Sequence, residues 1–290
     1  MKVLLLGTAA GGGFPQWNCA CRMCTAGLPP RTQDCLAVSA DGRGWYLVNV
    51  SPDIRTQLLG AKPLAAGPGP RDTPVRGAFL TDAELDHSLG LAMLREGAGL
   101  RVWAPDAVLT ALRADFPLRD IAARYGGWDW QPAGAVEVDG LRVTAVPVGS
   151  KRPRYVRSDV DGPWVVAYRI EDPATGGVLV YAPCLAEWSK RFDDLVAGAT
   201  CVVLDGTFYS PAEMSGATGG KLDNVQRAMG HIPIAGPEGS LARIAAHPGV
   251  RWVYTHLNNT NPILDPAGPE HAVVLAGGAA APPDGTELTL

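Results

Sequence analysis

Four side chains that could bind a metal or move protons follow one predicted strand. Asp82, Glu84, Asp86 and His87 lie within six residues, directly after an apolar run at 75–80. Carboxylates and imidazoles are ligands for iron and zinc and also act as acids and bases. A single Asp at a helix start is usually a cap, so the clustering carries the prediction more than any one member.

Three further candidates stand at the ends of predicted elements in the second half of the chain. Asp205 ends a predicted strand at 201–205, His256 follows another at 251–255, and His231 lies in a Met-Gly-His run. Loops at the ends of strands are where sites are usually built. We therefore expect these residues to meet the 82–87 cluster at one edge of a sheet.

A second constellation is a run of three cysteines. Cys19, Cys21 and Cys24 fall within six residues, and thiolates at this spacing can converge on one zinc ion, which prefers four ligands. The fourth ligand stays open, with Cys35 or a residue from a distant loop as candidates. A redox pair of Cys21 and Cys24 is the alternative, but no helix opens there.

Composition narrows the class of protein. The chain has 290 residues, 47% hydrophobic residues and a formal net charge of −4, so it lacks the basic footprint of a nucleic-acid-binding protein. We find no apolar run of transmembrane length and no secretory signal, and expect a cytoplasmic protein with no membrane contact. Gly and Pro together number 60 (35 plus 25), which predicts many turns and loops.

The predicted elements form one domain, 1–290, in which strands of both halves are followed by helices. This order favours two packed sheets with helices outside. A doubly wound dinucleotide-binding fold is the rival, because a glycine-rich loop at 7–13 follows the first strand. That loop lacks the G-x-G-x-x-G spacing and no helix start follows it. Strands are predicted at 2–6, 35–40, 45–50, 75–80, 141–148, 164–170, 178–181, 201–205, 251–255 and 287–290, and helices at 52–59, 86–96, 187–196 and 238–246.

The spacing of the first cluster resembles a known motif. Asp82-x-Glu84-x-Asp86-His87 is similar to the H-x-H-x-D-H motif of the metallo-β-lactamase fold with its first two histidines replaced. Longer segments at 11–19, 51–54, 89–97, 229–231 and 256–262 resemble the coenzyme PQQ synthesis protein B family. The cysteine run is also similar to the structural zinc site of a related phosphodiesterase of phosphonate breakdown, where a histidine near the place of Asn259 is the fourth ligand.

The resemblance implies an α/β fold, a metallo-β-lactamase-like αββα sandwich of two mixed sheets with outer helices. It implies a role in pyrroloquinoline quinone (PQQ) biosynthesis, with iron-dependent hydroxylation of the tyrosine ring in a small Glu–Tyr substrate. Asp86, His87 and His256 would hold Fe(II), with Zn as the other metal that these ligands suit, and Asp205 corresponds to a bridging carboxylate. Zinc would occupy the Cys19, Cys21 and Cys24 site as a structural ion.

Roles for the remaining residues follow from the same resemblance. His231 would be an acid, base or substrate contact. Asp82 and Glu84 would tune the site or bind the substrate's ammonium, and Arg95 or nearby Arg residues would pair with its carboxylates. Glu84 stands where we expect a neutral residue, and Cys35 and Cys184 look like additions to the family pattern.

Two other functions fit the same features. One is a zinc-dependent hydrolase of phosphodiesters or esters, and the other is a non-catalytic carrier that assists PQQ transport. A two-zinc hydrolase of this fold needs about five converging histidines, whereas this chain has five in total, of which His247 and His271 stand in helix and surface contexts. The scarcity favours a single-metal site. The oligomeric state stays open, with a homodimer as one arrangement.

Overall fold

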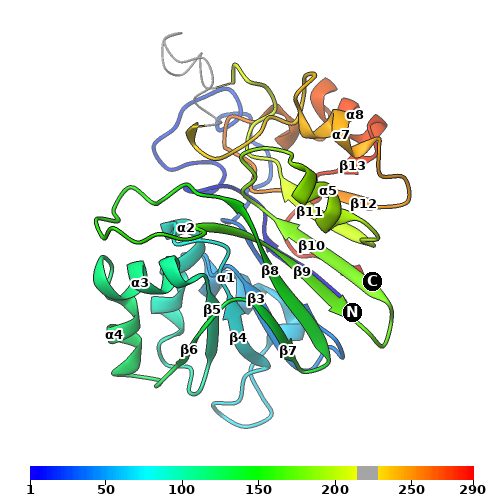
Figure 1. The fold of residues 1–290 in the computed structure, drawn as a ribbon. Helices are drawn as coiled ribbons and strands as arrows, with labels where there is room; N and C mark the ends of the chain where they lie inside the picture. The colour runs from blue at the N-terminus through cyan, green and yellow to red at the C-terminus, as the bar shows by residue number, and fades with distance from the viewer. Residues whose placement is uncertain (214–227) are drawn as a thin grey trace.

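Two seven-stranded sheets lie face to face in the computed structural model, which describes residues 1–213 and 228–290 (Figure 1). Helices cover both outer surfaces, so the expected αββα sandwich is confirmed. The first sheet contains, in spatial order, β14 (Thr286–Thr289), β1 (Lys2–Gly7), β2 (Cys35–Ser39), β3 (Trp45–Val48), β4 (Val75–Phe79), β5 (Arg101–Ala104) and β6 (Asp129–Pro132). The second contains β13 (Ala279–Ala280), β12 (Arg251–Thr255), β11 (Cys201–Asp205), β10 (Gly177–Ala182), β9 (Val165–Asp172), β8 (Leu141–Gly149) and β7 (Ala135–Val138).

The two sheets repeat one pairing pattern. Neighbours from β14 to β3 are antiparallel and those from β3 to β6 are parallel. In the second sheet the pairs from β7 to β10 are antiparallel and those from β10 to β13 are parallel. Strands β4 and β11 therefore occupy equivalent places, so Asp82, in the loop after β4, and Asp205, the last residue of β11, lie at equivalent strand ends.

Alternating side chains of the strands build three apolar layers. On β1, Val3 and Leu5 face the layer between the two sheets, whereas Leu4 and Leu6 face the helices outside the first sheet. Successive strand side chains point to opposite faces, so β1 is buried on both sides and reads as a continuous apolar run. A third cluster lies between the second sheet and its own helices.

The helices are short, and they divide between the two outer faces (Figure 1). The first half contains α1 (Ile54–Gly60), η1 (Lys62–Leu64), α2 (Leu85–Ser88), η2 (Leu89–Leu94), α3 (Asp106–Ala114) and α4 (Leu118–Ala123). The second half contains α5 (Lys190–Val196), α7 (Ser240–Ile244), η3 (Pro262–Leu264) and α8 (Pro269–Ala276). Among the described residues, no helix has both the length and the apolar character that crossing a bilayer requires.

One predicted helix is broken for a reason that matters to the site. The sequence predicts a helix over 86–96, but α2 ends at Ser88 and a 3₁₀ turn follows. The N–H of Val50 donates to the carbonyl of His87 (2.7 Å), and the N–H of Gly90 donates to the carbonyl of Val50 (3.0 Å). These bonds to the segment after β3 replace bonds that would continue the helix, and they fasten His87 to the sheet.

Candidate functional site

The acids and histidines singled out in the sequence gather where strands of both sheets end. Asp82 follows β4, Asp205 ends β11, and His256 comes directly after β12. Ring nitrogens of His87 and His256 lie within 4.8 Å of each other and of Cys184 Sγ. A second group of Asp205, His231 and His256 meets the same distance limit.

Asp82 and His87 form a buried pair. Nδ1 of His87 lies 2.8 and 2.9 Å from the two carboxylate oxygens of Asp82, and both side chains are buried. The N–H of Glu84 and the hydroxyl of Thr81 also donate to Asp82 (2.9 and 2.8 Å). Asp82 is therefore placed to orient His87, and it is too enclosed to bind a substrate ammonium directly.

Electrostatics favour positive charge at His87. Burial opposes that charge, but Asp82 and Asp86 outweigh it and raise the pKa of His87 to about 10. Burial alone would raise the pKa of Asp86, yet His87 and His256 hold it well below its ordinary value. Without a cation between these residues, a proton on His87 balances the carboxylates.

His256 is held in an uncommon backbone conformation. Its φ of 56° lies in the left-handed region, which non-glycine residues rarely adopt and which clusters at functional sites. Nδ1 of His256 lies 2.8 Å from the hydroxyl oxygen of Thr207, and Nε2 lies 3.3 Å from Oδ2 of Asp86. The ring thus links the second sheet to the cluster that follows the first.

Thr207 is the centre of a polar network behind His256. The hydroxyl of Thr207 donates its proton to Oδ1 of Asp205 (2.7 Å). The hydroxyl oxygen can therefore accept a hydrogen bond from Nδ1–H of His256. Oδ2 of Asp205 accepts from Nδ1 of His231 and from the N–H of Leu185, each at 2.8 Å. Burial opposes ionisation of Asp205, but His231 keeps its pKa below the ordinary value. Asp205 is thereby placed to anchor His231 and Thr207.

The outer nitrogens of two histidine rings face the same carboxylate oxygen. His87 and His256 contact Asp82 and Thr207 through Nδ1, so their Nε2 atoms face Oδ2 of Asp86, at 4.0 and 3.3 Å. Among the described residues, Nε2 of His87 is a buried atom with no hydrogen-bond partner. Partners that fix the tautomer of a histidine are typical of metal ligands. The donor set of Asp86, His87 and His256 therefore fits a divalent cation.

The glycine-rich loop after β1 closes against this donor set. A Cβ on Gly11 would lie 3.0 Å from Oδ2 of Asp86, so the loop needs glycine there to approach the carboxylate. Gly12, at φ 96°, donates its N–H to the side chain of Gln33 (3.0 Å). These contacts explain the glycine run without a nucleotide.

A cavity of about 270 Å³ opens beside the cluster. Its lining includes Asp82, Glu84, Lys151 and Cys184. Nζ of Lys151 forms an ion pair with Oε1 of Glu84 (3.0 Å), and both side chains are about one-third exposed. Burial and the nearby carboxylates, Asp82 first among them, raise the pKa of the Cys184 thiol well above its ordinary value. The cavity thus offers a paired cation and anion next to the donor set.

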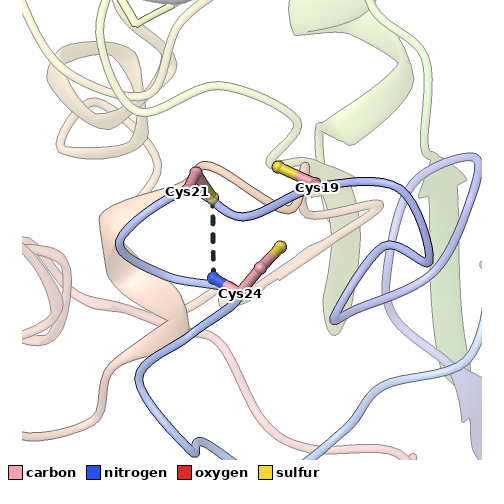
Figure 2. Close-up of side chains that lie close together, drawn as sticks. All are labelled: Cys19, Cys21 and Cys24. Atoms are coloured by element: carbon pink, nitrogen blue, oxygen red, sulfur yellow. Dashed lines mark hydrogen bonds between the residues drawn. The ribbon is translucent and has the colours of Figure 1, made fainter.

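The three cysteines of the second constellation also converge. We call Cys19, Cys21 and Cys24 the cysteine knuckle; Figure 2 shows their sulfur atoms facing a common space, and they lie within 4.8 Å of one another. The N–H of Cys24 donates to Sγ of Cys21 (3.5 Å) and, against the effect of burial, helps to lower the pKa of Cys21. Nδ2 of Asn259 lies 3.1 Å from Sγ of Cys19 and 3.4 Å from Sγ of Cys24. Asn259 therefore lies where a fourth ligand would be.

Several other sequence candidates lie elsewhere. Cys35 donates its thiol proton to the carbonyl of Asn49 (3.1 Å), away from the knuckle. Arg95 lies over the ring of Tyr125 and is absent from the cavity lining. His247 contacts Asp193 (3.1 Å), and His271 contacts the carbonyl of Ile263 (2.8 Å).

Some residues of the site give little signal in the sequence. Thr207 and Lys151 belong to common types, and only their place after a strand end, in loops next to the predicted ligands, could have marked them. Asp34 is a buried carboxylate that accepts from the hydroxyls of Tyr181 and Thr255, next to His256. Burial raises the pKa of Asp34, while His256 and His87 act against that rise.

The chain is similar in sequence to a family of known proteins. The model of the Beta-lactamase superfamily domain matches residues 44–257. Coenzyme PQQ synthesis protein B of Pseudomonas paraeruginosa is 38% identical to this chain over 306 residues, with 100% of both chains covered. The proteins of the same name from Pseudomonas aeruginosa and Pseudomonas putida are also 38% identical over 100% of both chains.

Solved structures agree with this placement. The crystal structure of Zn²⁺-bound PqqB from Methylobacterium extorquens covers 100% of both chains with a TM-score of 0.90 and 35% identity. A diphosphatase from the PhnP family has a TM-score of 0.71 and 19% identity, and covers 99% of this chain and 96% of its own. At that identity the second likeness shows the fold alone.

Proposed function

The chain belongs to the coenzyme PQQ synthesis protein B family, and from that membership we propose that it acts in PQQ biosynthesis as a metal-dependent enzyme. The reaction we propose is hydroxylation of the tyrosine ring in a Glu–Tyr-derived substrate. The observation that carries the metal site is the buried Nε2 of His87, which faces Asp86 and has no hydrogen-bond partner among the described residues.

Asp86, His87 and His256 would hold the metal. Two histidines and a carboxylate with open positions form a ligand set that suits non-heme Fe(II). When bound, iron would supply the activation of O₂. Asp82 and Thr207 fix the two imidazoles so that their Nε2 atoms point to one place.

The cavity supports a small charged substrate. Its volume of about 270 Å³ suits a dipeptide-sized molecule rather than a polymer. Glu84 and Lys151 offer one negative and one positive group, which would exchange their mutual ion pair for the substrate's ammonium and carboxylate. Of the two sequence candidates for binding an ammonium, Glu84 has the exposure that this role needs.

His231 would move a proton for the reaction. Its Nδ1–H is used by Asp205, which leaves Nε2 as the nitrogen that can accept a proton from the substrate ring. Its neighbour Gly230 lines the cavity, and His231 itself is buried next to it in the sequence. Asp205 would stabilise the imidazolium that proton acceptance creates.

Reconstitution tests the reaction. The full chain is loaded with Fe(II) without air and mixed with a Glu–Tyr dipeptide, O₂ and a two-electron reductant such as ascorbate. Hydroxylation consumes one O₂ and two electrons per product and releases one water. We expect hydroxylated dipeptide from the wild type and from a His247→Ala control, and none from His256→Ala. Equal activity in His256→Ala would contradict the ligand assignment.

Two alternatives predict different outcomes of the same work. A zinc hydrolase would hold two or three zinc ions per chain and cleave ester or phosphodiester substrates without O₂. A carrier would bind PQQ in the cavity and give no turnover with any metal. In the structure, Gly149 and Ser150 line the cavity at the end of β8, where a hydrolase of this fold would place another ligand histidine. This favours the single-metal enzyme.

A further inference from the structure

Cys184 lies at the candidate metal centre, yet the roles described so far do not use it. It follows β10 by two residues, in the loop that leads to α5, and it is partly buried. Its Sγ lies within 4.8 Å of ring nitrogens of His87 and His256. Among the described residues, Sγ of Cys184 forms no hydrogen bond, unlike the thiols of Cys21 and Cys35.

The charges and the unpartnered nitrogen around Cys184 favour the binding of a cation. His87, whose buried Nε2 has no hydrogen-bond partner among the described residues, belongs to the same group of potential ligands. The charges that act on the thiol include the carboxylates of Asp82, Asp86 and Asp205, against the single ammonium of Lys151. The loop is also fixed, because the N–H of the next residue, Leu185, donates to Asp205 (2.8 Å).

We propose that the Cys184 thiolate is a fourth ligand of the metal held by Asp86, His87 and His256. The site would then present one sulfur, two nitrogens and one oxygen. Sulfur ligands favour zinc and other soft metals over magnesium or calcium. Four such ligands complete the tetrahedron that zinc prefers, whereas iron, which accepts more ligands, would keep open positions beside the cavity.

This inference rests on the metal site of the proposed function but not on the reaction. The test therefore reads the ligands directly, by ¹¹³Cd NMR of the cadmium-loaded full chain. The cadmium chemical shift depends on the number of sulfur ligands, so the knuckle and the centre give separate resonances. We expect Cys184→Ser to move the centre resonance toward the position of a site without sulfur and to leave the knuckle resonance in place.

Control variants distinguish an error in the Cys184 assignment from an error in the metal site itself. Cys35→Ser removes a thiol outside both sites and should move neither resonance. An unchanged centre resonance in Cys184→Ser would overturn the ligand assignment alone. If His87→Ala abolishes no resonance of the wild-type spectrum, the metal site of the proposed function is overturned as well.

A measurement on the unaltered chain covers the case in which Cys184→Ser does not fold. Iodoacetamide labelling of Cys184, followed by mass spectrometry, is compared in the metal-free and cadmium-loaded wild type. Because burial and the nearby carboxylates raise the pKa of this thiol, the labelling is run for long times at alkaline pH. We expect slow labelling in the metal-free chain and its loss when cadmium is bound. Equal labelling in both states would overturn the assignment.

Discussion

The histidine–carboxylate centre and the cysteine knuckle are both groups of potential metal ligands, but the fold builds them in different ways. The centre takes Asp86 and His87 from α2 and His256 from the loop after β12, so it joins segments about 170 residues apart. The knuckle takes three thiols from one run of six residues. The two histidines of the centre are buried and Asp86 is 17% exposed, whereas all three knuckle cysteines are partly exposed.

The centre is organised without a metal, whereas the knuckle is held mainly by contacts among its own thiols. Each histidine of the centre has a second partner, Asp82 or Thr207, that sets its tautomer and direction. Such partners tune a metal site and usually cost 10–100-fold in affinity when lost, as a rough guide. Among the described residues, the knuckle sulfurs contact mainly one another and Asn259. We infer that the fold shapes the centre, while a metal would shape the knuckle.

Removing a ligand of the centre should have the largest effect. His87→Ala should abolish metal at the centre and lower product formation at least ~10³-fold, because several kcal/mol of metal-dependent stabilisation are lost. Elemental analysis should fall from two metals per chain to one, since the knuckle keeps its zinc. His247→Ala is the matched control. Two metals per chain in His87→Ala would contradict the assignment of His87 as a ligand of the centre.

The loss of His87 also leaves a buried charge on Asp82, which by itself destabilises the fold. The melting temperature of His87→Ala is therefore compared with that of the double variant Asp82→Asn/His87→Ala. The double variant should recover stability but not metal. Recovery of both would show that charge, not ligation, explains the first result.

Replacing the partner of His256 should have a smaller effect. Thr207→Val keeps the shape of the side chain but removes the hydroxyl that joins His256 to Asp205. We expect metal affinity at the centre to fall about 10–100-fold, as for other residues that orient metal ligands. The control is Thr110→Val, whose hydroxyl donates to the carbonyl of Asp106 in α3. Unchanged affinity in Thr207→Val would show that His256 needs no fixed tautomer.

The proton on His87 predicts a pH dependence for the centre. Because its pKa is raised to about 10, metal must displace this proton at neutral pH. Affinity should therefore rise about tenfold per pH unit toward pH 10 and then level off. The titration uses the Cys184→Ser variant, so that no thiol proton is counted. Adding Asp82→Asn removes a cause of the raised pKa, so the plateau should begin at lower pH; an unmoved plateau would contradict this cause.

Most of the centre can be predicted from the sequence, because its ligands lie at the ends of predicted strands. Apolar runs such as that of β1 mark strands, and the acids and histidines at or shortly after the ends of β4, β11 and β12 are then brought to one edge by the sheet topology. The thiols of the knuckle meet because they share one short segment. In both cases each candidate ligand is marked by the residues next to it in the sequence.

Relations across the fold could not be predicted in this way. Sequence analysis gives no strands or helices for 101–138, where β5, β6 and β7 have four residues each and β6 pairs with β5, 28 positions earlier (129 minus 101). The break after Ser88 depends on Val50, 38 positions earlier (88 minus 50). Cys184 looks like an addition in the sequence, and only the three-dimensional structure shows its sulfur next to His87 and His256.

The smallest effect on the centre should come from the knuckle, although the two regions share a loop. Cys21→Ser should release the knuckle metal, which elemental analysis detects, with Cys35→Ser as the control. Asn259 lies three residues after His256, but that turn is also held by Asn261, whose side chain donates to the carbonyl of Gly206 (2.7 Å), and by the N–H of Leu257, which donates to Thr8 (2.9 Å). The centre should therefore lose about fivefold in affinity at most, the equivalent of one hydrogen bond of ~1 kcal/mol. Simultaneous loss of both metals would mean that the knuckle and the centre form one cooperative unit, because the hydrogen bonds of the turn would then be too weak to hold His256.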